Sequence, residues 1–498
     1  MAPIRFPKPL WRRVIVVVVS LLVVGAGWWF LDKLLHACGG LGSGVVTIDL
    51  GGECVGVTDG SYVFDPALAS VEEKIAAENA SVTGSGHTVT VALLNPMTVN
   101  DTSPVSIAEV HNQLEGAYTA QHRANTKQPK ALGDPYPLIR LVLANEGSHE
   151  DQWKPVVHQL EGMVDAEPLV AVTGMGVSVT QTELGAKDLA AHGIPMVGAI
   201  TTADELSYAA IRGFVRVAPG NREQVQSLLA YLRRRPQLDS AIVVYDSNSD
   251  DPASPDLFTR SLRDDLRSGM SGLIKSAPSL SFTGASGQSE ASPDLFNNIT
   301  TNLCAVKPKV VLYAGRALDL LSFLTSLEGR VCPDTPMTVL TANTNLGSLT
   351  NNQETLRDKK ITVVNAAAAD APGWANGVPG TPAHFPNFRS EFGGLGLDLA
   401  HLDDGDVIAT HDALFTAVKA IRLASAQGNL PKAADVLGQL LNLNNLNTVP
   451  GASGELSFSF RGTRGDDSGN PCGKPIPVLE IPPSGSFPGE AGPPYVTC

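Results

Sequence analysis

Short apolar runs alternate with longer amphipathic segments along most of the chain. Three of these runs, Thr88–Leu94, Leu138–Ala144 and Leu169–Val172, have the length of a strand, and each is followed by a segment with helical spacing. Because the runs are almost continuously apolar, they are typical of strands that are buried on both faces. The pattern predicts an α/β fold in which parallel sheets are flanked by helices.

The same alternation starts again after Gly213–Val217, so the sequence contains a second α/β block. A third, incomplete block follows, with one strand at Ile361–Asn365 and a long helix at Asp406–Ala424. Residues 36–85 are rich in Gly, Ser and Asp, and we interpret them as a stalk or a small N-terminal cap. The last residues, 483–498, are rich in Pro and Gly, which predicts an irregular tail.

The N-terminus has the pattern of a membrane anchor. Four basic residues in 1–13 precede Val14–Leu31, a run without a charge that is long enough to span a bilayer. Because basic flanks stay in the cytoplasm, we expect a single-pass helix over 14–35 and an extracytoplasmic remainder. A cleaved signal peptide, or lipid attachment at Cys38, is the alternative.

Composition places the rest of the chain among globular proteins of more than one domain. The chain has 498 residues, of which 43% are hydrophobic and 17% charged. Its net charge of −14 argues against binding to nucleic acid. The sequence lacks the spacing of common nucleotide-binding, hydrolase and metalloprotease motifs, so we expect neither an enzyme nor a cofactor.

Six cysteines suit an exported chain, since disulfides persist outside the cytoplasm. Many pairings are possible; joining nearest neighbours, which closes the smallest loops, gives Cys38–Cys54, Cys304–Cys332 and Cys472–Cys498. The sequence contains no CxxC pair, and its ten histidines show no ligand spacing, so we expect no metal site.

Two neighbouring strand candidates end in small or hydroxyl-bearing residues. Leu169–Val172 leads to Gly174-Met175-Gly176, and Ile194–Ile200 leads to Thr201-Thr202. In open parallel sheets, ligands bind beyond the carboxyl ends of the strands. Candidate ligand contacts are therefore Ser178, Thr180, Thr201 and Thr202. The alternative is that Ser178 or Thr180 only caps the following helix.

The order and spacing of several motifs resemble the type I periplasmic solute-binding proteins, and specifically the branched-chain amino-acid-binding receptors of ABC transporters. The resemblance covers about residues 86–482. Its motifs are VTVALLNPMT, AVTGMGVSVTQTELGAKDLAAHGIPMVGAITTADELS, GFVRVAPGNREQ, KPKVVLYAGRALDLLSFLTSL, HDALFTAVKAIRLA and VPGASGELSFSFRGTRGD.

The resemblance implies two α/β lobes joined by three crossings, with the ligand in the cleft between them. Lobe 1 would consist of 86–212 and 343–450, and lobe 2 of 213–342 and 451–482. It also implies that the ligand carboxylate is held at the strand ends by Ser178, Val179, Ile200 (through its backbone) and Thr202, with Thr180 and Thr201 as close alternatives.

The sequence departs from that family at the expected ammonium site. Asn343 stands where an acidic residue would pair with the ligand, and the loop containing Asp250 replaces an expected aromatic residue. Arg316 lies at a position near the cleft, where its permanent cation would attract an anion. The alternative is a solvated arginine at a helix start. Together, Arg316, Asn343 and Asp250 favour a carboxylate-bearing ligand over a free α-amino acid.

Two functions agree with these features. One is a membrane-anchored receptor that captures a small ligand for uptake by an ABC permease. The other is a membrane-tethered ligand sensor or scaffold that regulates a partner protein without transport.

Overall fold

The computed structural model describes residues 15, 17–20, 38, 47–50, 52–126, 132, 135–274, 278–284, 295–343, 346, 349, 352–425, 429–458, 469–483 and 495–498. The predicted basic segment 1–13 and most of the predicted anchor 14–35 lie outside these residues. No helix in the described part of the chain is both long enough and apolar enough to cross a bilayer.

The first lobe is built on a seven-stranded sheet with the order β1-β2-β4-β3-β5-β6-β7. From β4 to β7 the neighbouring strands are parallel, and β1 and β2 extend one edge in antiparallel pairing. The strands are β1 Thr47–Leu50, β2 Glu53–Thr58, β3 Thr88–Asn95, β4 Leu138–Asn145, β5 Leu169–Gly174, β6 Met196–Gly198 and β7 Phe214–Arg216.

Helices cover both faces of this sheet, as the continuously apolar strands predict. Along β3, Val89, Val91 and Leu93 belong to one hydrophobic cluster, whereas Ala92 and Leu94 belong to another on the opposite face. The helices of this lobe include α2 Ala69–Val82, α3 Ile107–Asn125, α4 Trp153–Ala166, α5 Thr180–Ala191, α13 Asp406–Ala424 and α14 Ala433–Leu437.

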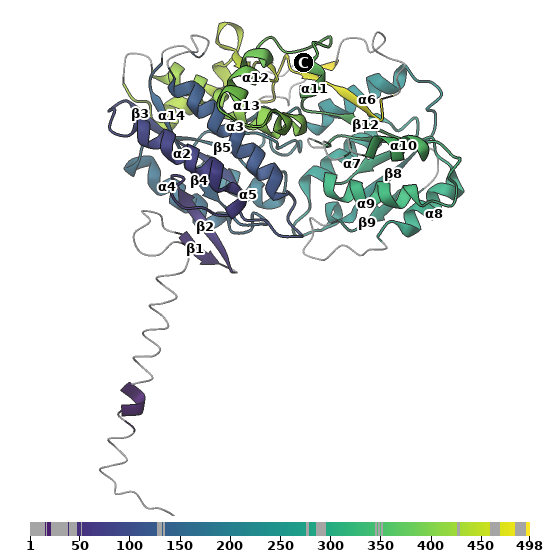
Figure 1. The fold of residues 1–498 in the computed structure, drawn as a ribbon, viewed down its shortest axis with the longest axis horizontal. Coiled ribbons are helices and arrows are strands. Elements are labelled where there is room, and N and C mark those ends of the chain that lie inside the picture. Colours follow the sequence, from purple (N-terminus) through teal and green to yellow (C-terminus); the bar gives the residue numbers. More distant parts are fainter. Residues whose placement is uncertain are drawn as a thin grey trace, which may run out of the picture.

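The second lobe is built on a six-stranded sheet with the order β16-β12-β11-β10-β8-β9. Figure 1 shows the two lobes side by side, with β12 and α10 beside the teal helices of the second lobe. Its strands are β8 Ala241–Asp246, β9 Leu280–Phe282, β10 Val310–Ala314, β11 Met337–Thr341, β12 Ile361–Ala366 and β16 Val478–Ile481. Its helices are α6 Asn221–Arg233, α7 Leu257–Gly269, α8 Asn297–Val306, α9 Ala317–Glu328 and α10 Gln353–Asp358.

Smaller elements lie between and around the lobes. Two antiparallel pairs are formed by β13 Val449–Gly451 with β14 Gly454–Leu456, and by β15 Pro475–Ile476 with β17 Tyr495–Val496. The short helices include α11 Ala371–Ala375, α12 Phe385–Gly394 and the 3-10 helix η5 Leu399–Asp404. The segment with η5 leads directly into α13.

Three segments lie in different places from those the sequence analysis gave them. β12 pairs with β11 and β16, so it belongs to the second sheet and not to lobe 1. Within residues 36–85, β2 pairs with β4, and Ile75 of α2 packs into the first core, so this segment is part of lobe 1. Phe458, assigned to lobe 2, is buried in that same core. Pairing and packing are long-range, and hydrophobic spacing alone does not specify them.

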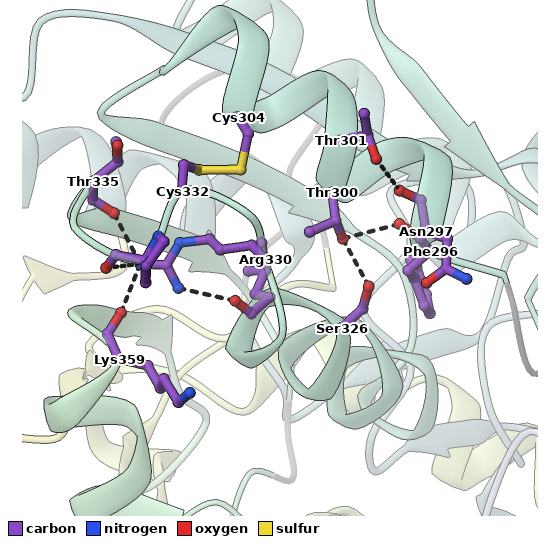
Figure 2. The surroundings of a disulfide bond; sticks show 12 residues. Phe296, Asn297, Thr300, Thr301, Cys304, Ser326, Arg330, Cys332, Thr335 and Lys359 are labelled. Carbon is purple, nitrogen blue, oxygen red and sulfur yellow. Dashed lines mark hydrogen bonds between the residues drawn. A yellow bond between two sulfur atoms is a disulfide. The ribbon is translucent and has the colours of Figure 1, made fainter.

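The three disulfides join the pairs that the smallest loops predicted: Cys38–Cys54, Cys304–Cys332 and Cys472–Cys498. In Figure 2 the second of these connects α8 to the segment that follows α9. Beside it, the guanidinium of Arg330 donates hydrogen bonds to backbone carbonyls, including that of Lys359 at 2.6 Å. The disulfide and Arg330 together fix the end of one α/β unit.

Candidate ligand-binding site

The loop after β5 lies close to the rest of the first sheet, and its glycines make this possible. Gly174, Met175 and Gly176 all have positive φ angles, of 84°, 64° and 51°. A Cβ atom on Gly176 would lie 2.5 Å from the carboxylate of Glu150, and one on Gly174 would lie 2.6 Å from the Leu93 side chain. Only glycine fits these positions without a shift of its neighbours.

Ser178 connects the ends of β5 and β6. Its hydroxyl oxygen accepts hydrogen bonds from the backbone amides of Thr202 at 2.9 Å and Ala203 at 3.1 Å. Its carbonyl accepts from the amide of Phe258 at 3.0 Å and from Nη2 of Arg316 at 3.4 Å, both in the second lobe. Ser178 therefore joins the two strand ends and also joins the two lobes.

A cavity of about 50 Å³ lies between the lobes at this point. Five of the predicted ligand-binding residues line it: Ser178, Ile200 and Thr202 from the first lobe, and Arg316 and Asn343 from the second. The other residues of its lining are Pro104, Val105, Glu109, Val177, Phe258, Ala317, Leu318, Ala342 and Asp406. The cavity is small beside the roughly 300–1,000 Å³ of typical ligand pockets, so the lobes must separate to admit a ligand.

Four predicted residues are not part of this lining. Val179 is the residue before α5, and the hydroxyl of Thr180 donates to the carbonyl of Pro255 at 2.9 Å across the lobes. Thr201 is fully buried, and its hydroxyl packs against Gly198. Asp250 has a side chain that is 53% exposed and forms a 2.6 Å ion pair with Arg263. Asp250 is the last residue of the short 3-10 helix Ser247–Asp250 that follows β8.

Arg316 is a buried, paired cation and not a solvated one. Only 8% of its surface is exposed, and its Nε donates to Asp256 at 2.8 Å. The guanidinium also lies over the ring of Phe258, 5.5 Å from its centroid. Asp256 in turn caps α7 by accepting from the amide of Thr259. The charge of Arg316 is therefore balanced within the second lobe and directed at the first.

Comparisons with known proteins agree with this geometry at the level of the fold. No family model and no curated protein sequence matches the chain. Among solved structures, the leucine-binding protein LivK from Thermotoga maritima is 15% identical, with a TM-score of 0.53 over 80% of this chain and 96% of its own. The chain has the type I periplasmic binding-protein fold.

Other solved structures with the type I fold carry different ligands. The branched-chain amino-acid transporter protein LivJ from Streptococcus pneumoniae, solved with isoleucine, is 13% identical, with a TM-score of 0.55 over 79% of this chain and 95% of its own. A solute-binding protein from Rhodopseudomonas palustris, solved with 3,4-dihydroxybenzoic acid, is 12% identical, with a TM-score of 0.54 over 78% and 92%.

In this type I fold, Asn343 is held at the strand ends of the second lobe. Its side-chain amide donates to the hydroxyl of Thr341 at 2.8 Å and to the carbonyl of Gly315 at 3.3 Å. Its backbone exchanges two hydrogen bonds with the side chain of Asn365. The Asn343 side chain is thus fixed and offers the cavity a neutral polar group.

The sequence analysis missed two acidic residues of the cavity, Glu109 and Asp406. They come from the starts of α3 and α13, which are distant in sequence, so no local spacing connects them. Burial raises the pKa of Asp406 well above its ordinary value, and the neighbouring carboxylate of Asp404 raises it further. One Asp406 oxygen accepts from Gln113 at 3.2 Å, and the other is buried without a hydrogen-bond partner among the described residues.

A further buried acid supports the loop after β5. Glu150 accepts hydrogen bonds from the amide of Val177 at 2.8 Å and from the hydroxyl of Thr182 at 2.5 Å. Burial raises the pKa of Glu150 to about 7, while its hydrogen bonds and the cation of Arg316 lower it. Glu150 holds Val177, which lines the cavity, in place.

Proposed function

We propose that the protein is an extracytoplasmic solute-binding receptor that captures a small ligand by closure of its two lobes. The observation that carries this proposal is the interlobe cavity, which takes hydroxyl groups from the first lobe and Arg316 and Asn343 from the second. A ligand that contacts both sets is bound fully only when the lobes are together, so binding favours closure. This is a binding role, and we propose no enzymatic activity.

The charges around the cavity suggest the chemistry of the ligand. Arg316 and the amides of Thr202 and Ala203 suit a carboxylate. That carboxylate would compete with Asp256 for Arg316 and with the Ser178 hydroxyl for the amides. Glu109 and Asp406 line another part of the cavity and suit hydrogen-bond donors. We infer a carboxylate-bearing ligand that also carries donor groups.

We also propose a location and a partner for the receptor. We propose that residues 14–35 form an uncleaved single-pass anchor, with the N-terminus in the cytoplasm and the lobes outside. An ABC permease would be the partner that takes the ligand. N-terminal sequencing of the mature protein tests the anchor: a chain that begins at a lipid-modified Cys38 would contradict it.

One observation favours a second candidate, a membrane-tethered sensor or scaffold without transport. The lobes are already joined by direct contacts, including the Phe258 amide to the Ser178 carbonyl and Thr180 to the Pro255 carbonyl. A protein whose lobes are closed without a ligand can transmit a signal when a ligand or a partner protein opens them. Such a protein would bind ligands weakly, because a ligand would have to replace these contacts.

A thermal-shift screen of the full-length chain against carboxylates and short peptides tests the receptor. We expect at least one compound to raise the melting temperature, because a ligand that binds only the folded protein stabilises it. Arg316→Gln should weaken the binding affinity for that compound by about tenfold to a hundredfold, since charge-assisted contacts contribute roughly 1.5–3 kcal/mol. Lys309→Gln, at an exposed lysine of the same lobe, should leave binding unchanged. Failure of every compound would favour the sensor.

A further inference from the structure

Two histidines and a glutamate from distant parts of the first lobe converge at one point. His111 and Glu115 lie one turn apart on the same face of α3, and His401 comes from η5. Nδ1 of His401 lies 2.7 Å from one Glu115 oxygen, and Nδ1 of His111 lies 3.9 Å from the other. The two imidazole rings meet edge to face, with centroids 5.5 Å apart.

The geometry of the three side chains is close to that of a metal site. One donor atom from each lies within 4.8 Å of the others. Around a tetrahedral Zn²⁺ with bonds of about 2.0–2.1 Å, neighbouring ligand atoms are about 3.3 Å apart. The 2.7 Å separation, to one Glu115 oxygen, is shorter than this, and the 3.9 Å separation, to the other oxygen, is longer, so the side chains must adjust slightly to hold an ion.

The burial of the group also suits an ion. The Glu115 side chain is only 6% exposed, whereas those of His111 and His401 are 20% and 36% exposed. A metal can therefore enter from the histidine side and bind a carboxylate that is largely shielded from water. Two imidazoles and one carboxylate form a donor set that Zn²⁺ accepts, with a fourth position left for water.

We propose that His111, Glu115 and His401 form a binding site for a transition-metal ion, and that Zn²⁺ is the ion that best fits this donor set. Apart from the one-turn spacing of His111 and Glu115, no local pattern reveals this group, because Glu115 and His401 are 286 residues apart. The fold, and not a local motif, brings them together. The expectation of no metal site from the histidine spacing is replaced by this proposal.

The position of the group indicates what the ion would do. η5 leads through Asp404 into α13, where Asp406 lines the cavity. An ion shared by α3 and η5 fixes this segment against α3, where Asn112 already donates to Asp404. The ion would therefore stabilise the acidic wall of the cavity without contacting the ligand, and the site exists whether or not the protein binds a solute.

Two other groups in the described part of the chain provide matched controls. Glu161, Asp188 and His192 also have donor atoms within 4.8 Å, but they include one histidine, which is 50% exposed. His122 on α3 pairs with Glu78 at 2.9 Å and has no second imidazole in the group. The first control tests nonspecific surface binding, and the second tests an ordinary histidine–glutamate pair on the same helix.

Isothermal titration of the full-length, metal-stripped chain with Zn²⁺, after removal of any histidine tag, tests the proposal. We expect one ion per chain at this site. His111→Ala and His401→Ala should each weaken the affinity for Zn²⁺ by at least about a hundredfold, because the loss of even a residue that supports a ligand from the outer shell lowers metal affinity 10- to 100-fold. Co²⁺ in place of Zn²⁺ should give the strong visible absorption of a tetrahedral site in the wild type, and His111→Ala and His401→Ala should lose it.

The controls decide between the outcomes. His122→Ala and His192→Ala should leave the affinity unchanged, and Zn²⁺ should raise the melting temperature of both as it does for the wild type. If a histidine-to-alanine variant does not fold, Glu115→Gln preserves the shape and should still lose the Co²⁺ spectrum. Absence of Zn²⁺ binding in the wild type overturns the proposal. Binding that survives His111→Ala, or that disappears in His192→Ala, overturns it equally.

Discussion

Ser178, which the sequence analysis predicted to contact a ligand, stabilises the fold through its hydroxyl group. Its hydroxyl is the acceptor for two buried amides, those of Thr202 and Ala203. Leaving a buried donor without a partner costs about 1–3 kcal/mol, so Ser178→Ala should lower the free energy of unfolding by about that amount. Urea unfolding of the full-length chain measures this loss.

The control for Ser178 is another hydroxyl of the same segment. Thr180→Val removes a donor to the Pro255 carbonyl and should cost only about 0.5–1.5 kcal/mol. Ser178→Thr retains the acceptor and should recover most of the stability. If Ser178→Ala is as stable as the wild type, water or another group satisfies the two amides, and the hydroxyl is available to a ligand.

His411 on α13 should make the stability depend on pH. The residue is buried between the rings of Phe388 and Phe415, and burial lowers its pKa to about 4. Its Nδ1 bonds Asp412 and its Nε2 faces Arg123, so the ring is neutral in the folded protein. The unfolded chain, with a pKa of about 6.5, takes up a proton first as the pH falls, which favours unfolding.

The stability from His411 is therefore present above pH 6.5 and is lost as the pH falls towards 4. Between pH 7 and pH 5 the loss should be about 2 kcal/mol. Urea midpoints of the wild type and of His411→Gln at both pH values measure it: the variant should be less stable overall but should depend less on pH. His158→Gln, at a histidine that is 87% exposed, should behave as the wild type does. Equal pH dependence in all three proteins would contradict this prediction.

Among the secondary-structure elements, α8 should depend on a disulfide for part of its stability. The disulfide Cys304–Cys332 closes a loop of 28 residues in the second lobe. On the chain-entropy account, such a loop contributes about 3–4 kcal/mol to stability. The double variant Cys304→Ser/Cys332→Ser should lose about that much in guanidinium unfolding, with early loss of amide protection in α8. Equal unfolding midpoints would mean that core packing and hydrogen bonds, among them that between Thr300 and Ser326, hold α8 without the disulfide.

The strands that the sequence predicted well are those buried on both faces. Thr88–Leu94 and Leu138–Ala144 are each one residue shorter than β3 and β4, because each strand continues through a buried asparagine, Asn95 or Asn145, that ends the apolar run but not the burial. The sheet to which β12 belongs could not be predicted, since a strand's pattern does not name its partner. The position of Ser178 at a strand end was predictable, because it depends on the local sequence alone. The approach of Glu109 and Asp406 to the same cavity was not, because it depends on how distant elements pack.

At the scale of the whole molecule, the contact between the lobes extends beyond the cavity to an ion pair. Arg260 on α7 lies 2.9 Å from Glu205, which follows β6 in the first lobe, and both side chains are 32% exposed. An exposed pair of this kind contributes about 0.2–1 kcal/mol. Glu205→Lys removes this attraction and adds a repulsion, so it should reduce the ratio of closed to open molecules by about fivefold. The double variant Glu205→Lys/Arg260→Glu reverses both charges and should close again.

Distances between spin labels on the exposed positions Lys154 of α4 and Thr325 of α9 report how far the lobes are apart. The Glu205→Lys variant should show a longer and broader distance distribution than the wild type. The double variant Glu205→Lys/Arg260→Glu should return to the wild-type distribution. Lys187→Glu breaks an ion pair that lies within α5 and should have no effect. If the single variant matches the wild type, the ion pair does not hold the lobes together. Closure would then depend on the contacts of Ser178 and Thr180 with the second lobe, where a ligand would have to act.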